Sequence, residues 1–429
     1  MAEKFETVQW ATGTNIYEVN LRQYTPAGTF QAFEKELPRL RNMGIEILWF
    51  MPLTPISAEK RQCTLGSYYA CSNYTAINPE FGEASDFKKL VATAHDQGFK
   101  VIIDWVANHT GYDHTWTAEH PELYKKDVNG NFYDAYGWQD VIDLDYSKPE
   151  LWNLMIAAMR FWISEFDIDG FRCDMAHLVP LGFWMEARAE LDRHKKLFWL
   201  GECEVPEYHA VFDATYAWSL LHTMEAVYRK EATVQSLTTA LEASAREYPE
   251  NALRLSFTSN HDENSHSGSE YERFGEGAKA FAVLTLTWKN SLPLIYSGQE
   301  MPNKKRLKFF DKDEIEWTGE YFLHNFYQTL LSLRKNSKVY QTRAEQVAVT
   351  LVKTSAPDNI FAFSLKDGTA EEVLVILNLS PENVRFAITE DLAPGKFTSI
   401  FSGIETDIYT GKNFELLAWE YLVCTKNVD

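Results

Sequence analysis

Residues 85–105, SDFKKLVATAHDQGFKVIIDW, contain one complete helix-to-strand unit and decide the fold class. Ser85 can cap a helix, and Gly98 can end it. Four apolar residues at helical spacing give this helix one apolar face: Phe87, Leu90, Val91 and Ala94. The β-branched run 101–105 follows at once and predicts a short buried strand. Short buried strands that alternate with helices are typical of a parallel sheet.

The same alternation extends in both directions along the chain. Seven further runs predict strands, at 16–21, 45–50, 169–173, 198–202, 214–218, 253–258 and 294–296. Helical patterns separate most of them; Pro149 begins one helix, and Pro38 predicts either a kink or a helix start. About eight such units over roughly 340 residues favour a (β/α)8 barrel, to which we assign residues 1–345.

Two segments depart from this alternation. Residues 110–140 are polar, aromatic and rich in turn residues, which predicts a short excursion after the third strand of the barrel. From residue 346 onward, the apolar runs VAVTLV, NIFAFSL and VLVILNL lie between turn signals, with no helical pattern between them. We therefore expect a separate antiparallel β-sandwich domain over 346–429.

The charge balance excludes several classes of partner. The chain has 429 residues, and its 61 acidic and 41 basic side chains give a net charge of −20. Because phosphate binding draws on clustered Lys and Arg, we expect neither nucleic acid nor an anionic membrane surface as a partner. No run of about 18 apolar residues is present that could span a bilayer. Nothing in the sequence indicates an oligomeric state.

Cysteine usage and the N-terminal segment indicate the compartment. The five cysteines lie far apart with no C-x-x-C pair, so we expect neither a disulfide framework nor a zinc site. The first thirty residues show no signal-peptide pattern. We therefore expect a reduced, cytoplasmic compartment, which a leader missing from the sequence would change to the periplasm or to secretion.

Polar side chains follow four of the predicted strands, at the end of the barrel where (β/α)8 enzymes carry their active sites. They are Asp104, His109, Arg172, Asp174, His177, Glu202 and the run SNHDEN at 259–264. A single acid at a strand end is more often a helix cap or a turn residue, but here four strand ends carry one. The sequence has no H-E-x-x-H spacing, no G-x-S-x-G and no phosphate-binding glycine loop. Carboxylates without such partners favour acid–base chemistry, above all glycoside cleavage.

The sequence resembles the α-amylase family, glycoside hydrolase family 13, through four short motifs. They are DWVANH (104–109), GFRCDMAH (170–177), GE (201–202) and FTSNHD (257–262), in the family's order. Three weaker matches agree: LGSYYACSNYTAINPEFG, VIDLDY and LPLIYSGQE. The resemblance covers about residues 14–300, and a β-domain after 346 fits the family's C-terminal domain.

The resemblance implies a role for each matched residue. Asp174 would be the nucleophile, Glu202 the general acid/base, and Asp262 the carboxylate that stabilises the transition state. The substrate-binding and positioning residues would be Asp104, Tyr69, His109, Arg172, His177 and His261. Arg172 would keep Asp174 ionised by lowering its pKa, whereas Glu202 would need a raised pKa to stay protonated. Tyr69 would stack under the reacting sugar ring.

The resemblance leaves the roles of His177, Asn108 and Asp145 undecided. His177 and Leu178 stand where starch-degrading members carry Lys-His, so His177 either replaces that lysine beside the leaving-group sugar or only begins a helix. Asn108 and Asp145 match calcium ligands of the family, and the alternative is that they brace the excursion. Two ligands do not complete a shell of six to eight oxygens. Apart from this structural calcium, we expect no cofactor.

The excursion also carries four aromatic residues, Trp116, Tyr133, Tyr136 and Trp138. They either line sugar subsites or pack on the rim of the barrel.

We therefore expect a retaining glycoside hydrolase that cleaves α-1,4-glucosidic bonds in maltooligosaccharides or in starch- and glycogen-type α-glucans, through a covalent glycosyl–Asp174 intermediate. Two alternatives use the same residues: a 4-α-glucanotransferase-like transglycosylase, and an enzyme of the α-glucosidase or cyclomaltodextrinase type. An alternative of another class is a non-catalytic α-glucan-binding homologue. The presence of all three acids counts against it.

Overall fold

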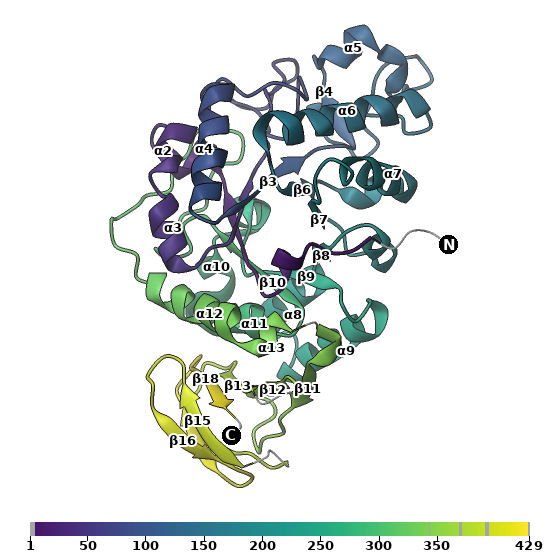
Figure 1. Cartoon of the computed structure of the whole chain (residues 1–429). Coiled ribbons are helices and arrows are strands. Elements are labelled where there is room, and N and C mark those ends of the chain that lie inside the picture. The colour runs from purple at the N-terminus through teal and green to yellow at the C-terminus, as the bar shows by residue number, and fades with distance from the viewer. Residues whose placement is uncertain (1–4, 343, 369–370, 391–393, 428–429) are drawn as a thin grey trace.

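Eight parallel strands close into a barrel in the computed structural model, which describes residues 5–342, 344–368, 371–390 and 394–427 (Figure 1). The barrel strands are β1 (Ile16–Val19), β2 (Ile47–Phe50), β3 (Lys100–Trp105), β6 (Gly170–Cys173), β7 (Phe198–Gly201), β8 (Ala214–Tyr216), β9 (Leu253–Ser256) and β10 (Ser291–Tyr296). They pair in chain order, and β10 pairs with β1 to close the ring. The predicted (β/α)8 fold is confirmed.

Helices surround the barrel (Figure 1). The longer ones are α3 (Leu37–Met43), α4 (Ala84–Asp96), α6 (Pro149–Phe166), α7 (Leu181–Leu191), α8 (Trp218–Tyr228), α9 (Val234–Glu247), α11 (Ala278–Thr287) and α12 (His324–Asn336). Shorter helices of four or five residues are α1 (Leu21–Tyr24), α2 (Phe30–Glu34), α10 (Glu270–Phe274) and α13 (Lys338–Gln341). Each barrel helix buries an apolar face, as the sequence pattern predicts.

Local chemistry sets where these helices begin. Helix α4 begins at Ala84, because Glu83 and Asp86 form a reciprocal capping box in which the Glu83 N–H donates to Asp86 at 2.9 Å. The predicted cap at Ser85 is therefore wrong by two residues. Pro38 lies in the first turn of α3, where a missing N–H costs no intrahelical hydrogen bond, so the helix-start interpretation of Pro38 is the correct one.

Between β3 and β6 the chain leaves the barrel and returns (top of Figure 1). Strands β4 (His109–Gly111) and β5 (Val141–Asp143) pair antiparallel, with His109 opposite Asp143. Helix α5 (Thr115–Glu119) and a 3-10 turn, η2 (Pro121–Leu123), lie between them. This excursion begins immediately after the carboxyl end of β3 and so stands beside the predicted site.

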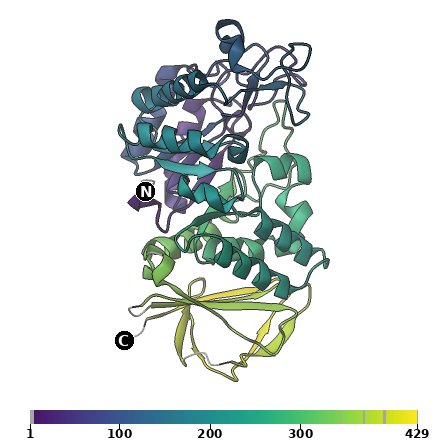
Figure 2. The same ribbon diagram turned by 90° about the vertical axis from the view of Figure 1, so that its right-hand side faces the viewer.

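After α13 the chain forms two antiparallel sheets below the barrel (Figure 2). The larger, in the order β11-β12-β13-β18-β15-β16, contains β11 (Ala348–Leu351), β12 (Ile360–Lys366), β13 (Glu371–Asn378), β18 (Tyr421–Asn427), β15 (Gly395–Ser399) and β16 (Glu405–Ile408). The smaller contains β14 (Val384–Ala387) and β17 (Asn413–Leu416).

Alternate residues of β12 face two different cores. Phe361 and Phe363 join the core of the barrel, whereas Ile360 packs with Phe386 and Leu416 of the smaller sheet. The C-terminal part is thus a sandwich of two sheets, as predicted, whose larger sheet also packs on the barrel.

Within the described part of the chain, no helix has the length and apolar composition needed to cross a membrane.

Candidate active site

Three of the predicted acids lie at the carboxyl ends of adjacent strands. Asp104 is the penultimate residue of β3, Asp174 follows β6 directly, and Glu202 follows β7 directly. Backbone pairing continues one residue past the strands. The N–H of Asp174 donates to the last carbonyl of β3 (3.0 Å), and the N–H of Glu202 donates to the last carbonyl of β6 (2.9 Å). The barrel therefore fixes these three acids side by side.

One buried guanidinium connects the three acids. The Nη1 atom of Arg172, on β6, lies 3.0 Å from an oxygen of Asp104 and 3.0 Å from an oxygen of Asp174. Its Nη2 lies 3.0 Å from Glu202 Oε2, and its Nε donates to the hydroxyl of Tyr216 at 3.1 Å. The side chain of Arg172 is fully buried, so its charge is not screened by water.

Burial shifts the pKa values of these acids upward. Loss of water raises the pKa of Glu202 to about 7, although Arg172 opposes the shift, so Glu202 can hold a proton near neutral pH. Burial also raises the pKa of Asp174 to about 7. Arg172 does lower the pKa of Asp174 as predicted, but its single charge is shared among three acids and burial outweighs it. Burial likewise raises the pKa of Asp104 to about 6.

Asp262 has the opposite electrostatic environment. His261 Nε2 lies 3.2 Å from Asp262 Oδ2, and His261 Nδ1 lies 2.5 Å from Oε1 of Glu18 on β1. Burial opposes protonation of His261, but the two carboxylates raise its pKa well above the ordinary value. Burial would raise the pKa of Asp262, but the charge of His261 lowers it to about 2. Asp262 is therefore ionised at a pH where Glu202 can be protonated.

Sequence reasoning missed Glu18. Its carboxylate is fully buried and holds His261 from the opposite side to Asp262. The available signal was an acid inside the otherwise apolar strand IYEV, since an acid is rarely buried without a charged partner.

Tyr69 lies in this network. Its hydroxyl donates to Asp104 at 3.1 Å and lies 2.7 Å from His261 Nε2. The ring of Tyr69 is stacked beside that of Phe309, with centroids 6.2 Å apart and an angle of 11° between the planes. Phe309, in the segment after β10, was also missed, because it is embedded in the strongly charged run KKRLKFFDKD.

His109 joins the excursion to the barrel. It is buried, burial lowers its pKa to about 4, and its ring centroid lies 5.1 Å from that of Trp138. Trp138, Tyr136 and Tyr133 are exposed. Trp116 is buried against other aromatic rings, so rim packing is the correct interpretation for that residue.

His177 is exposed on a single 3-10 turn, η3 (Ala176–Leu178), and does not begin α7, which starts at Leu181. Within the described residues, no hydrogen bond is recorded for its imidazole. The turn follows Met175, whose left-handed backbone (φ +41°) directs its N–H to Glu202 Oε2 at 2.8 Å.

The two residues predicted to hold calcium each make polar contacts with neighbouring residues. The Asp145 carboxylate accepts the N–H of Ser147 (3.1 Å) and lies 3.8 Å from the Lys148 ammonium. The amide nitrogen of Asn108 donates to His109 at 3.2 Å. Across the described residues, no group of three or more His, Cys, Asp or Glu side chains could hold a metal ion.

A lysine, Lys125, lies at the base of the excursion. Its Nζ lies 3.0 Å from Oδ2 of Asp143, whose side chain is fully buried. Among the described residues, the second oxygen of Asp143 has no hydrogen-bond partner, and neither has one buried oxygen each of Asp134 and Asp140. Burial raises the pKa of Asp143, which agrees with this excess of acid over base.

A (β/α)8 barrel with acids grouped around one arginine at the carboxyl ends of its strands is an arrangement suited to carboxylate acid–base chemistry. Comparisons with known proteins specify the family. The model of the α-amylase catalytic domain matches residues 9–133 and 123–316. The chain belongs to the α-amylase family.

Individual known proteins also resemble this chain. The α-amylase MalA of Haloarcula japonica is 26% identical over 88% of this chain, and this chain spans 57% of the length of that relative. An α-1,4-glucan:maltose-1-phosphate maltosyltransferase of Rhodospirillum rubrum is 33% identical over 37% of this chain and 26% of its own length. The crystal structure of the maltogenic α-amylase AmyB from Thermotoga neapolitana matches with a TM-score of 0.90 and 28% identity, covering 98% of this chain and 100% of that one.

Proposed function

We propose that this enzyme is a retaining hydrolase of α-1,4-glucosidic bonds in maltooligosaccharides and related α-glucans. The observation that carries the proposal is the division of protonation states: burial lets Glu202 hold a proton near neutral pH, while Asp262 stays ionised. Glycoside cleavage needs this division, because one acid protonates the leaving oxygen while carboxylates face the developing positive charge.

Each residue then has one task. Asp174 attacks the anomeric carbon, and Glu202 donates its proton to the leaving oxygen and later removes a proton from the attacking water. Asp262 stabilises the oxocarbenium-like transition state. Arg172 positions the three acids that it contacts. Tyr69, His109, His261 and Asp104 bind the reacting sugar, and the exposed His177 contacts the leaving-group sugar.

Substitution of the acids tests these roles. Asp174→Asn and Glu202→Gln should each lower kcat on maltoheptaose by more than about 1,000-fold, because each removes a group that acts only in the transition state. Glu207→Gln, an exposed carboxylate close in sequence to Glu202, is the matched control and should keep wild-type kcat. A loss of less than about tenfold in either acid variant refutes the assignment.

Transfer to a sugar instead of water is the second candidate, and the similarity to a maltosyltransferase favours it. The same covalent intermediate would then be intercepted by a sugar hydroxyl. Chromatography of the products from maltoheptaose separates the two functions. Hydrolysis gives only shorter chains, whereas products longer than the input would establish transfer.

We also propose that the excursion is held without calcium. Lys125 supports this, because it places a fixed positive charge on the buried carboxylate at the base of the β4–β5 pair.

A further inference from the structure

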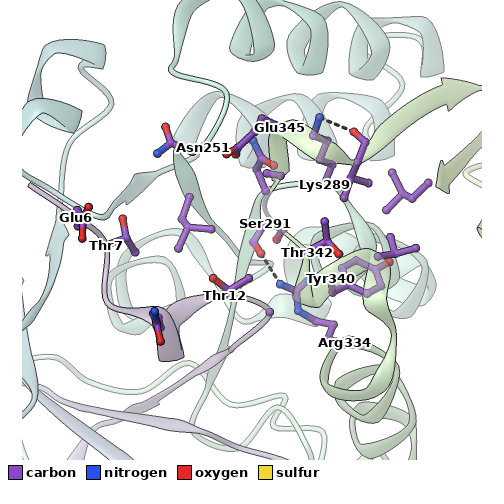
Figure 3. Close-up of a pocket in the computed structure, with 18 of the residues that line it drawn as sticks. Glu6, Thr7, Thr12, Asn251, Lys289, Ser291, Arg334, Tyr340, Thr342 and Glu345 are labelled. Atoms are coloured by element: carbon purple, nitrogen blue, oxygen red, sulfur yellow. Dashed lines mark hydrogen bonds between the residues drawn. The ribbon is translucent and has the colours of Figure 1, made fainter. Parts of the chain in front are cut away.

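The two ends of the barrel use their polar groups in different ways. At the amino ends of β9 and β10, a cavity of about 360 Å³ is lined by Lys289 and by Arg334 of α12 (Figure 3). The terminal nitrogens of Arg334 donate to the carbonyls of Leu286 (3.0 Å) and Ser291 (2.6 Å). Lys289 Nζ donates to the carbonyl of Val347 at 2.7 Å. Backbone carbonyls therefore engage both cations, whereas the acids at the other end of the barrel leave polar atoms open.

One oxygen of Asp174 and one oxygen of Glu202 are open in this sense. Asp174 Oδ1 accepts from Arg172 Nη1 at 3.0 Å, and Glu202 Oε2 accepts from the N–H of Met175 at 2.8 Å. Asp174 Oδ2 and Glu202 Oε1 make no hydrogen bond with the described residues, and neither is among the buried atoms that lack a partner. These two oxygens therefore keep accessible surface, and a substrate can reach them.

The donor to Glu202 Oε2 belongs to a strained turn directly after Asp174. Met175 has a left-handed backbone (φ +41°), which is unfavourable for any residue with a side chain other than Asn or Asp. Neighbouring bonds impose this conformation. The N–H of Asp174 donates to the carbonyl of Trp105 (3.0 Å), and the N–H of Ala176 donates to the carbonyl of Glu202 (3.1 Å). Strain that the surroundings impose in this way is concentrated at functional sites.

Two side chains hold the turn from behind. The indole Nε1 of Trp184, a fully buried residue of α7, donates to the carbonyl of Ala176 at 3.0 Å. The hydroxyl of Tyr208 lies 2.9 Å from the carbonyl of Val179 and 3.2 Å from that of His177. The turn is thus fixed by contacts that do not involve the carboxyl group of Glu202.

The surroundings of Oε2 decide which oxygen of Glu202 carries a proton. Oε2 accepts the Met175 N–H, and Arg172 Nη2 lies 3.0 Å from the same atom, although no hydrogen bond from Nη2 is recorded within the described residues. An oxygen that accepts an N–H beside a cation is the less basic of the two, so a proton on this carboxyl group resides on Oε1. Oε1 is also the oxygen that a substrate can reach.

On the basis of the acid/base role proposed above for Glu202, we propose that Met175 is a positioning residue: its left-handed backbone holds Oε2 as an acceptor and leaves Oε1 to carry the proton. In the first step Oε1 gives its proton to the glycosidic oxygen as the bond from that oxygen to the anomeric carbon breaks, and Asp174 Oδ2 bonds to that carbon. In the second step water attacks the carbon, the bond to Oδ2 breaks, and Oε1 takes the proton of the water.

Substitutions that differ in their tolerance of the left-handed conformation test the proposal. Glycine adopts it freely, leucine tolerates it about as methionine does, and β-branched valine avoids it. Met175→Val should therefore displace the N–H from Oε2. Burial raises the pKa of Glu202 and the Met175 N–H opposes that shift, so loss of the bond should raise the pKa further.

The expected effects are on kcat and on its pH dependence. For Met175→Val, the alkaline limb of kcat/KM on maltoheptaose should move up by about one pH unit, which corresponds to one hydrogen bond to a charged group. The kcat value should fall by about tenfold and KM should change by less than about threefold, because the acid is misplaced only for the transition state. Met175→Gly and Met175→Leu are matched controls and should keep the limb at the wild-type pH.

The pKa of Glu202 can also be followed without substrate, by 13C NMR of glutamate labelled at the carboxyl carbon. The signal is assigned by its absence from Glu202→Gln. The variants at position 175 leave unchanged all the ionisable side chains that act on Glu202, which are Asp104, Arg172, Asp174, Cys203, Tyr216 and Asp262. If Met175→Val does not fold, the α-hydroxy analogue of methionine incorporated at position 175 removes only the N–H, and the same rise in pKa is expected.

The proposal is overturned if Glu202 titrates at the wild-type pH in Met175→Val or in the α-hydroxy variant. It is also overturned if Met175→Gly shifts the titration as much as Met175→Val does. A wild-type enzyme that does not hydrolyse maltoheptaose would instead contradict the proposed function, and the NMR titration would still decide the role of Met175.

Discussion

At the scale of single residues, the site depends on how one buried arginine is shared. Arg172 contacts three acids, so it fixes their positions without holding the pKa of Asp174 low. Local motifs were sufficient to predict that Arg172 and these acids come together, because each motif ends a barrel strand. They could not predict Glu18, which contacts His261 from 243 residues away in the sequence. They also could not predict how the pKa values respond to burial and to nearby charge, since both effects depend on all the residues packed around the acids.

The pH dependence of the reaction follows from the two raised pKa values. Activity requires Asp174 without its proton and Glu202 with its proton. Burial raises the pKa of both to about 7, and Asp174 further raises that of Glu202, so the pair loses its protons in two separate steps. As pH falls, Asp174 gains a proton and activity is lost; as pH rises, Glu202 loses its proton and activity is lost. We therefore expect a bell-shaped profile of kcat/KM with its maximum near pH 7.

A substrate with a good leaving group separates the two limbs. An aryl maltoside with an acidic phenol needs no proton from Glu202, so Glu202→Gln should keep measurable formation of the intermediate and lose only the alkaline limb. An activity maximum at pH 4–5, or wild-type activity that persists to pH 10, would contradict these pKa shifts.

At the scale of elements, the excursion shows where sequence patterns fail. The pattern correctly placed a turn-rich segment after the third strand, but the match of Asn108 and Asp145 to calcium ligands did not predict their actual contacts. The carboxylate of Asp145 accepts the Ser147 N–H and lies near the Lys148 ammonium, while Lys125 pairs with the buried Asp143. These contacts depend on how the β4–β5 pair folds back, which no local pattern specifies. The cap of α4 is likewise Glu83 and not Ser85, because Glu83 and Asp86 bond reciprocally to each other's backbone.

Removal of the Lys125 charge tests the metal-free excursion. Lys125→Met leaves Asp143 buried without its partner and should lower the free energy of unfolding by about 1–2 kcal/mol. Lys148→Met, which breaks the more exposed pair with Asp145, should cost less than about 0.5 kcal/mol. EDTA should leave Tm of the wild type unchanged. A fall in Tm with EDTA that calcium restores, or equal effects of the two variants, would contradict the proposal.

At the scale of the whole molecule, one face of the larger C-terminal sheet joins the apolar core of the barrel, while its other face packs in a second core inside the sandwich. Both parts were predictable, because strands alternate with helical patterns in the barrel, whereas strands follow one another without helical patterns in the sandwich. The contact between the two parts could not be predicted. The sequence shows apolar residues on both faces of β12, but it does not show which face packs on the barrel. In the structure Phe361 and Phe363 lie in the barrel core, and Trp288 of the barrel packs on Phe363 with ring centroids 4.9 Å apart.

We therefore expect barrel and sandwich to unfold together. Differential scanning calorimetry should show a single transition, and Phe363→Ala should shift the whole peak to lower temperature, with a loss of about 3–5 kcal/mol. Tyr409→Ala, at an exposed ring of the sandwich, should leave the peak in place. Two resolved peaks, of which Phe363→Ala moves only one, would show that the parts are independent.

The proposed reaction cleaves an α-1,4-glucosidic bond with retention, through a covalent bond to Asp174. The most direct test is proton NMR of the first sugar released from maltoheptaose, recorded before mutarotation. Two successive displacements at the anomeric carbon preserve its configuration, so the α-anomer should appear first. Initial release of the β-anomer would mean a single displacement by water and would contradict the proposed mechanism.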